Sequence, residues 1–179
     1  KNSYFKDEKV AISTARAGNV IGGGDFAENR IIPDCIRAAY KSQEIIVRNP
    51  YSIRPYQHVL EPLYVYLMIA KAQCENIEFA GYYNVGPDEC DCITTGDLVD
   101  LFCKEWGNGQ AWKNVCNQGP HEAQFLKLDC SKLKNTFGWG PRWQITEAVV
   151  KTVEWAKVYE QNDSIVDCME KQIRLFMLG

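Results

Sequence analysis

The sequence predicts an α/β fold, and three observations support this. Short apolar runs rich in β-branched and aromatic residues alternate with longer segments of helical periodicity, which is typical of strands joined by helices. The chain is 46% hydrophobic and 24% charged, close to the average of globular proteins, which argues against a disordered chain. Its 179 residues can bury a sizeable core, and no apolar run approaches the roughly 20 residues of a membrane-spanning helix.

The strands are predicted from apolar runs that are bounded by turn residues. The first covers residues 10–15 and is expected to be buried, and it leads into a turn-rich loop over residues 18–25. The pairs Asn49-Pro50 and Arg54-Pro55 mark two further loops, the second just before a strand that contains His58. The other strands are expected at residues 44–47, 82–85, 112–116 and 125–128.

The helices are predicted from apolar positions that recur every three or four residues, together with start and stop signals. Pro62 suits the first turn of one helix, while Thr94 or Thr95 can cap another that stops at Gly107. Asp129 can cap a short helix in the same way. The helices are expected at residues 31–42, 61–74, 97–106, 131–137, 146–159 and 164–178.

Charge and cysteine content narrow the functional class. With 20 basic and 23 acidic side chains the net charge is −3, which gives no electrostatic footprint for nucleic acid or an anionic membrane. The eight cysteines predict free structural thiols and therefore a cytoplasmic protein, with disulfides or a metal site as alternatives. Cys90-Asp91-Cys92 has the wrong spacing for a redox pair or a zinc knuckle. Four cysteines lie among apolar neighbours in expected helices, namely Cys35, Cys74, Cys103 and Cys168.

Two glycine- or arginine-containing segments could bind a phosphate. Gly22-Gly23-Gly24 follows a strand but matches neither common nucleotide-binding glycine motif, so a tight turn requiring positive φ is the alternative. Arg54 can present a planar fork to a phosphate or carboxylate, and Arg30 and Arg48 are similar candidates. The alternative for each arginine is a solvated charge or an ordinary ion pair.

A polar loop at residues 119–123 is a third candidate, because the Glu122 carboxylate could accept from vicinal hydroxyls. The alternative is a solvated turn. His58, within an apolar strand, is expected to be structural. No tyrosine is followed by a lysine four residues later, no Ser/His/Asp set stands out, and the presence of only two histidines argues against a histidine-based metal site. The residues by themselves therefore predict an α/β domain with candidate binding groups and no catalytic set.

Six segments, taken in order, resemble one enzyme family. Residues 14–25 and 30–37 come first, and Gly22-Gly23-Gly24-Asp25 and His121-Glu122-Ala123 are the most distinctive runs. Together the segments resemble the extended short-chain dehydrogenases that act on nucleotide sugars, and within these the CDP-glucose 4,6-dehydratase branch. The remaining segments are residues 53–63, 83–87, 121–132 and 138–143.

The resemblance implies a two-lobed enzyme. An N-terminal Rossmann lobe holds NAD, and a smaller C-terminal lobe binds the nucleotide of CDP-glucose. In the family a Tyr-x-x-x-Lys pair and NAD oxidise the sugar at C4, water is lost across C5 and C6, and hydride returns at C6 to give CDP-4-keto-6-deoxyglucose. Residues 1–179 contain neither this pair nor the glycine-rich NAD fingerprint. The chain is therefore expected to be one unit, the C-terminal substrate-binding lobe with the last Rossmann elements, while the N-terminal Rossmann core is absent.

Further expectations follow from the same resemblance. The catalytic residues are expected upstream of Lys1, so the chain alone should be inactive, with no catalytic, cofactor-binding or metal-binding residue of its own. Residues 162–179 form a tail with a possible extra helix, and the full-length enzyme is expected to be a homodimer. An exposed apolar face is expected where the other lobe would pack. Two alternatives stay open: another nucleotide-sugar epimerase or dehydratase with a UDP or GDP donor, or a non-catalytic nucleotide-sugar binding module.

The resemblance also implies roles for individual residues. Arg54 matches the arginine that clamps the pyrophosphate, and Asn19 matches the asparagine that hydrogen-bonds the diphosphate region. Glu122 matches the acidic residue that holds the ribose hydroxyls, with His121 beside it. The segment that borders the base and the nucleotide is matched by Arg30, Ile31, Ile32 and Pro33.

Overall fold

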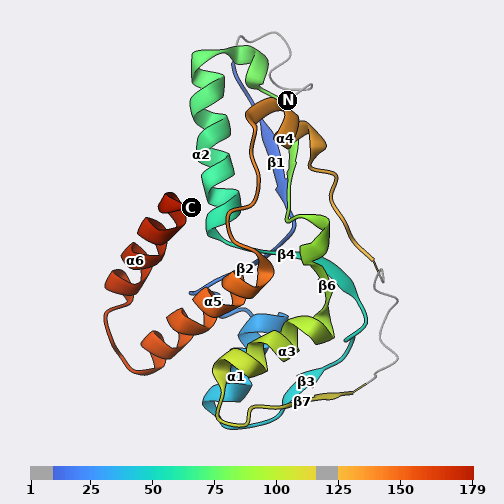
Figure 1. The fold of residues 1–179 in the computed structure, drawn as a ribbon, viewed down its shortest axis with the longest axis vertical. Coiled ribbons are helices and arrows are strands. Elements are labelled where there is room, and N and C mark those ends of the chain that lie inside the picture. Colours follow the sequence, from blue (N-terminus) through green and yellow to red (C-terminus); the bar gives the residue numbers. More distant parts are fainter. Residues whose placement is uncertain (1–9, 116–124) are drawn as a thin grey trace.

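The structure, a computed structural model, describes residues 10–115 and 125–179 (Figure 1). It has the α/β fold expected from the sequence, with short strands joined by helices. In chain order the elements are β1 (Thr14–Ala17), β2 (Asn19–Ile21), α1 (Ile31–Tyr40), β3 (Ile45–Val47), β4 (Ile53–His58), α2 (Leu60–Glu75), η1 (Ile77–Phe79), β5 (Tyr82–Val85), η2 (Glu89–Asp91), β6 (Cys92–Thr94), α3 (Thr95–Trp106), β7 (Trp112–Asn114), α4 (Ser131–Phe137), α5 (Ile145–Glu160) and α6 (Ile165–Leu178).

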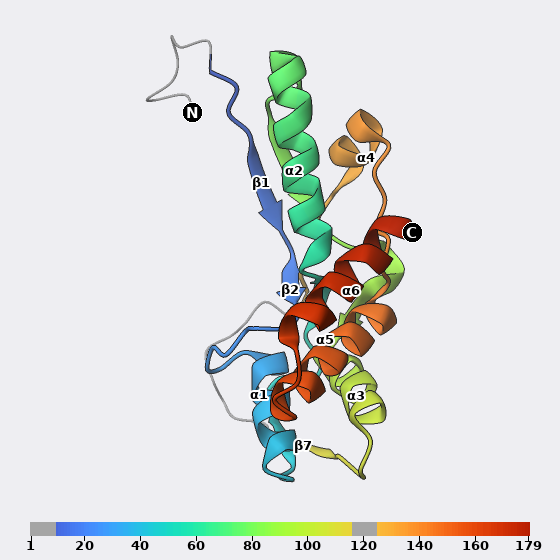
Figure 2. The same cartoon turned by 90° about the vertical axis from the view of Figure 1, so that its left-hand side faces the viewer.

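The described strands form three small sheets. β1 pairs with β5 and β3 pairs with β7, both in parallel. Between these two sheets, β4 pairs in parallel with β2 and antiparallel with β6. Figure 1 shows β1 beside α2 and α4 in the upper part of the molecule, and β3 and β7 at its foot. In the lower part α5 packs on α3 and β4, and α6 packs on α5 (Figure 2).

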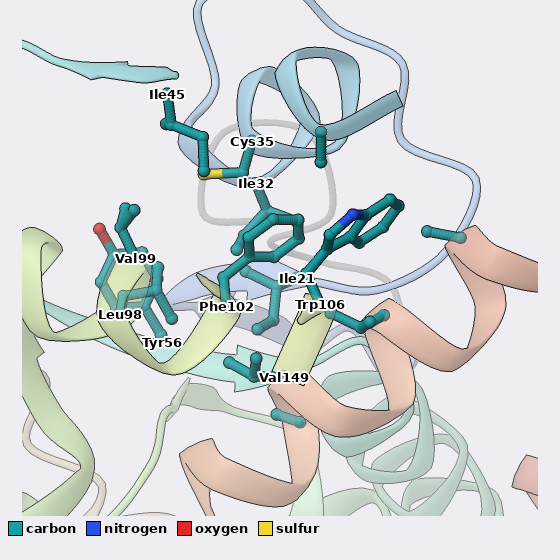
Figure 3. Close-up of a cluster of buried hydrophobic side chains, with 14 of the residues drawn as sticks. Ile21, Ile32, Cys35, Ile45, Tyr56, Leu98, Val99, Phe102, Trp106 and Val149 are labelled. Atoms are coloured by element: carbon teal, nitrogen blue, oxygen red, sulfur yellow. The ribbon is translucent and has the colours of Figure 1, made fainter. Parts of the chain in front are cut away.

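The larger hydrophobic core lies in the lower part of the molecule (Figure 3). Phe102 of α3 is fully buried at its centre, between Ile32 and Cys35 of α1 and Val149 of α5. Ile21 of β2 closes the core from the central sheet. These helices form because their apolar residues recur at helical spacing, so each buries one face against the others. This core fixes the positions of β2, β4 and α1, from which the candidate site is built.

A second core lies in the upper part, between α2, β5 and α4. It consists of Val65, Ile69, Tyr83, Val85, Leu133 and Trp139. The two parts meet where the chain passes from β1 to β2. A Cβ atom at Gly18 would lie 2.6 Å from the backbone oxygen of Pro55, so only glycine allows this close approach. The backbone oxygen of Val85 accepts from the Gly18 N–H and from Gln57 Nε2, each at 2.9 Å, which ties the upper sheet to the central one.

Most predicted elements are confirmed, including every helix, with helix ends that differ by at most two residues. The capping signals explain this agreement. Thr94 caps α3 through a capping box with Asp97, and the helix ends at Gly107. Ser164 caps α6. The N-cap residue of α4 is Cys130 and not Asp129 as predicted, although Asp129 Oδ1 accepts the Ser131 N–H at 2.9 Å just before this helix.

Two predictions near the N-terminus are wrong. The first strand begins at Thr14, not at residue 10, and it is half exposed instead of buried. Its partner β5 begins at Tyr82, and the Gly81 N–H before it bonds to Ser13 Oγ at 3.1 Å, so the ladder cannot extend further back. The expected loop over residues 18–25 contains strand β2, which pairs along β4.

Two more predictions around β4 are wrong. Arg54-Pro55 lies inside this strand and not in a loop. Proline fits there because the β6 ladder ends at Pro55 and the β2 ladder starts at Tyr56. Residues 125–128 form no strand: only Phe125 bridges Ile53, which is paired with β6 along its other edge.

The seven cysteines within the described residues are all free thiols, as predicted. Cys35 and Cys168 are buried among apolar neighbours. Burial raises the pKa of the Cys35 thiol well above its ordinary value, so it stays protonated and inert. Cys103 is half-buried. Cys74 is exposed, contrary to expectation, because it lies in the last turn of α2, beyond the part that packs on β5.

Candidate functional site

A cavity of about 700 Å³ opens between β2, the start of α1, the end of β3 and β4. This volume is within the range of small-molecule binding sites. Sequence segments that are far apart meet here, because β2 and β4 are neighbours in the central sheet and α1 packs beside them. The described residues of the predicted site all line it, namely Asn19, Arg30, Ile31, Ile32, Pro33 and Arg54.

Three residues named in the predictions lie outside the part of the chain that the structure describes. His121 and Glu122 fall between residues 115 and 125, so their roles in ribose binding stay predictions. Lys1 belongs to residues 1–9, which the structure does not describe either. The expectation that the catalytic residues lie upstream of Lys1 is therefore untested and stays a prediction as well.

Asn19 and Arg54 are brought together by the parallel pairing of β2 and β4. Asn19 is the partner of Tyr56 in this ladder, two residues beyond Arg54. Arg54 is only 8% exposed, and its Nη1 donates to the backbone oxygen of Ile53 at 2.9 Å. A guanidinium held this deeply creates a positive potential in the adjoining cavity, which favours an anionic group of a ligand.

The glycines of the loop after β2 are explained by close packing. A Cβ atom at Gly23 would lie 2.1 Å from the indole ring of Trp155 on α5, so glycine is required by lack of space. Gly24 has a φ of 82°, which fits the alternative of a tight turn. Gly23 therefore lets the loop pass over α5, Gly22 lies close to Val59, and Gly24 supplies the turn. Their presence does not by itself indicate a phosphate cradle.

The rest of this loop is held by charged side chains. Arg30 Nη1 donates to Asp25 Oδ2 at 3.2 Å, so Arg30 is half of an exposed ion pair. Arg37 of α1 donates to the backbone oxygens of Phe26 and Ala27, both at 3.1 Å. Asp25 Oδ1 accepts the Ala27 N–H at 3.0 Å. These bonds fix the loop along one wall of the cavity.

Sequence reasoning missed the buried hydroxyl groups of this site. The Thr95 Oγ1 lies 2.9 Å from Ser52 Oγ and 3.0 Å from the Tyr56 hydroxyl oxygen, and all three residues line the cavity. The signal was the pair Thr94-Thr95: Thr94 caps the helix, which leaves Thr95 to turn inward. Because each hydroxyl has a partner, the cluster is stable although it is buried.

Arg48, which the sequence offers as a further phosphate-binding candidate, lines the same cavity. It directly follows β3, and its Nη2 donates to Asn29 Oδ1 at 2.9 Å. Among the described lining residues there are three arginines and two aspartates. Asp25 is paired with Arg30, and Asp34 with Arg37, which lies outside the lining. The cavity therefore carries a net positive charge in the described part, consistent with an anionic ligand.

Two buried polar residues, His58 and Glu61, lie near this site but outside the cavity lining. His58 is 2% exposed, its Nδ1 accepts the Leu60 N–H at 3.3 Å, and its ring packs edge-on against Trp143. Burial, with a smaller effect of Lys151, lowers the pKa of His58 to about 4. The predicted structural role of His58 is thereby confirmed, since it neither lines the cavity nor is charged at neutral pH.

Glu61 anchors the loop that follows α4. Its Oε1 accepts the backbone N–H groups of Arg142 and Trp143, both at 2.8 Å, and the residue is fully buried. Burial raises the pKa of Glu61, although the two N–H groups and the Arg142 charge oppose this.

The described residues contain no cluster of three or more side chains suited to a metal ion. Within these same residues, no helix is both long and apolar enough to cross a membrane.

No family model matches the sequence. A CDP-glucose 4,6-dehydratase of Salmonella typhimurium is 41% identical to it over 183 aligned residues, which cover 99% of this chain and 51% of that protein. The chain thus spans about half the length of the curated relative that it matches.

Solved structures with the same fold are nucleotide-sugar enzymes. A dTDP-glucose 4,6-dehydratase from Bacillus anthracis in complex with NAD gives a TM-score of 0.70 at 17% identity, over 88% of this chain and 48% of that one. A UDP-glucuronic acid 4-epimerase from Bacillus cereus, with UDP-glucuronic acid and NAD, gives 0.72 at 15% identity over 87% and 48%. A UDP-glucose 4-epimerase from Stenotrophomonas maltophila, with NAD and formylated UDP-arabinopyranose, gives 0.75 at 16% identity over 88% and 51%. The fold is therefore that of the C-terminal part of extended short-chain dehydrogenases.

Proposed function

The chain is by sequence a relative of CDP-glucose 4,6-dehydratase, and we propose that it forms the nucleotide-sugar-binding half of such an enzyme. The observation that carries the proposal is the shared cavity. Residues from three separate segments, Asn19, Arg30 and Arg54, line one positively charged hollow of about 700 Å³. These are the positions to which the family resemblance assigns the diphosphate and the nucleotide.

In the proposed complex, Arg54 binds the pyrophosphate and Asn19 donates its amide to the same group. A charge-assisted hydrogen bond contributes about 1.5–3 kcal/mol, and the planar fork of an arginine can make two. Because Arg54 is already buried, little side-chain entropy is lost when the ligand binds. Ile32 and Pro33, at the start of α1, line the cavity and are assigned to the nucleoside.

The ribose is assigned to Glu122, with His121 beside it. A carboxylate accepts from both vicinal hydroxyls, so Glu122→Ala should weaken CDP binding more than binding of an analogue that lacks them. Equal losses for both ligands would contradict this role.

Catalysis is proposed for the whole parent enzyme, as the NAD-dependent loss of water from CDP-glucose. NAD supplies the hydride acceptor there, but this chain does not fit that cofactor. It has no glycine-rich dinucleotide fingerprint and no Tyr-x-x-x-Lys pair. The role proposed for the present residues is to bind and orient the nucleotide sugar, and the 179-residue chain should bind CDP without turning over CDP-glucose.

The upper part of the fold supports a larger parent. β1 and β5 form a parallel sheet of two strands among the described residues, whereas parallel sheets are normally larger and covered on both faces. On the adjoining helix α2, Leu63 is 48% and Leu67 is 72% exposed. Such a sheet edge and apolar surface suit packing against further elements of a parent enzyme. That the parent is a homodimer stays a prediction.

Titration calorimetry of the 179-residue chain with CDP, UDP and GDP tests the proposal. CDP should bind tightest, and Arg54→Ala should weaken it by at least tenfold, since one lost charge-assisted bond exceeds about 1.4 kcal/mol. Arg54→Lys keeps the charge without the fork and should also bind weakly. Arg174→Ala is the matched control, because Arg174 is an exposed arginine on α6 paired with Glu170.

The outcomes separate the alternatives. Unchanged CDP affinity in both Arg54 variants would overturn the site. Tighter binding of UDP or GDP would favour another nucleotide-sugar enzyme. If the full-length protein that contains this chain has no Tyr-x-x-x-Lys pair, a non-catalytic binding module would be favoured.

A further inference from the structure

We propose that Arg48 reads the base of the bound nucleotide and selects cytosine over uracil through a two-pronged hydrogen bond to N3 and O2. The inference rests on the proposed function, because it requires a pyrimidine nucleotide in the cavity. It adds a specificity-determining residue that the family resemblance did not assign.

The position of Arg48 after a strand of a different sheet is the first support. Arg54 and Asn19 come from the central sheet, whereas Arg48 follows β3, which belongs to the separate β3–β7 sheet. Figure 1 shows β3 and β7 at the foot of the molecule, below β2 and β4. All three residues line the same cavity. A nucleotide with its diphosphate on Arg54 therefore extends its nucleoside toward either α1 or β3.

The contact with Asn29 connects Arg48 to the segment proposed to border the base. Arg48 Nη2 donates to Asn29 Oδ1 at 2.9 Å, and Asn29 directly precedes Arg30 at the start of α1. Asn29 has a φ of 62°, in the left-handed region that asparagine tolerates better than most residues. The loop around it is held by Arg37, as described above. Asn29 thus fixes the orientation of the Arg48 guanidinium beside the nucleoside segment.

Charge pairing distinguishes Arg48 from Arg30, which also lines the cavity. Arg30 is paired with the Asp25 carboxylate. The hydrogen bond from Arg48 is to a neutral amide, which leaves its positive charge uncompensated by that partner. Its guanidinium has five N–H groups in a plane, and the bond to Asn29 uses one of them.

The chemistry of the two pyrimidines then gives the discrimination. Cytosine offers two adjacent acceptors, N3 and O2, which match two parallel N–H groups of a guanidinium. Uracil carries a hydrogen on N3, and a guanidinium has no acceptor for it. One donor is then left facing another donor in a partly desolvated site. A good two-pronged contact to a base discriminates by about 10- to 100-fold.

Calorimetry on the 179-residue chain provides the test, with CDP, UDP and the diphosphate of 2-pyrimidinone riboside. This last probe keeps N3 and O2 as acceptors but lacks the 4-amino group of cytosine. The wild type should bind CDP at least tenfold tighter than UDP and the pyrimidinone analogue within about threefold of CDP. Arg48→Ala should bring CDP and UDP to similar affinities, while inorganic pyrophosphate binds as in the wild type.

Two further variants sharpen the result. Arg48→Gln should reduce or reverse the preference, because an amide oxygen can accept the uracil N3–H while its amino group donates. Arg174→Ala, remote from the cavity, should keep the wild-type preference.

Each remaining outcome decides the question. If Arg48→Ala keeps the CDP preference of the wild type, the inference is overturned while the proposed function stands. If the wild type binds CDP and UDP equally, the inference is overturned, and the proposed function keeps its nucleotide site but loses its assignment to a CDP sugar. If the pyrimidinone analogue binds as weakly as UDP, the 4-amino group is read instead, which also overturns the inference. If the wild type binds none of the nucleotides, the proposed function itself fails, and the inference fails with it.

Discussion

Acidification should destabilise the fold through His58. This histidine is 2% exposed, and burial holds its pKa at about 4, compared with 6.5 for an ordinary histidine. Between these two values the unfolded chain binds a proton that the folded chain excludes. Stability from His58 is therefore complete above pH 6.5 and is lost as the pH falls toward 4.

The expected loss of stability can be calculated from the lowered pKa of His58. A difference of about 2.5 units corresponds to roughly 3 kcal/mol in total, of which about 2 kcal/mol is lost by about pH 5. Urea unfolding at several pH values between about 7 and 4.5 measures the loss as a decrease in the free energy of unfolding.

A matched pair of variants isolates the contribution of His58. His58→Asn keeps an acceptor near the position of Nδ1 but does not titrate in this range, so its stability should vary less steeply with pH. His121→Asn removes the other histidine of the chain and should keep the wild-type slope. Burial raises the pKa of Glu61 and Asp91, which act in the opposite direction in all three proteins and cancel in the comparison. A His58→Asn profile parallel to that of the wild type would refute the reasoning.

Three substitutions should change stability by amounts that urea unfolding can resolve. Gly23→Ala should cost about 1–3 kcal/mol or more because its Cβ meets the Trp155 ring, while Gly140→Ala, with open space around it, should cost little; equal losses would contradict this. Glu61→Ala leaves two backbone N–H groups without an acceptor and should cost about 2–5 kcal/mol, with Glu61→Gln less damaging. Thr94→Ala should cost about 1 kcal/mol by removing the cap of α3, and an unchanged midpoint would argue against the capping box.

The helices could be predicted closely because their signals are local. The Thr94 cap, the Gly107 stop and the apolar spacing of α5 each act within a few residues. The strands were less predictable, since a strand's length depends on its partner. β1 does not start before Thr14, because β5 provides no partner there. Arg54-Pro55 can lie within strand β4 because the pairing with β6 ends at Pro55 and the pairing with β2 begins at Tyr56. Neither fact is visible in the local sequence.

The site residues also divide into those that the sequence indicates and those that depend on contacts between distant segments. Arg54 and Asn19 were identified through their resemblance to family motifs, and the parallel pairing of β2 with β4 explains why they share a cavity. The pair Thr94-Thr95 could have indicated an inward-facing Thr95, but its partners Ser52 and Tyr56 could not be predicted, because hydroxyl groups from two distant segments meet only after folding. The glycines after β2 look like a phosphate-binding motif in sequence, but packing against Trp155 accounts for Gly23.

The residues assigned to nucleotide binding are distributed unevenly between the two parts of the molecule. Every described residue assigned to nucleotide binding comes from β2, β4 or the start of α1, or directly follows β3, and all these elements contribute to the larger core. The upper core around β5 and α2 supplies none of them. Under the proposed function, binding should therefore depend on the lower core, and the upper sheet would set where the nucleotide sugar lies relative to the proposed catalytic lobe. The close contact of Gly18 with Pro55 and the bonds to the Val85 oxygen make that junction short and well packed. A junction of this kind favours a fixed orientation between the bound sugar and the lobe that would act on it.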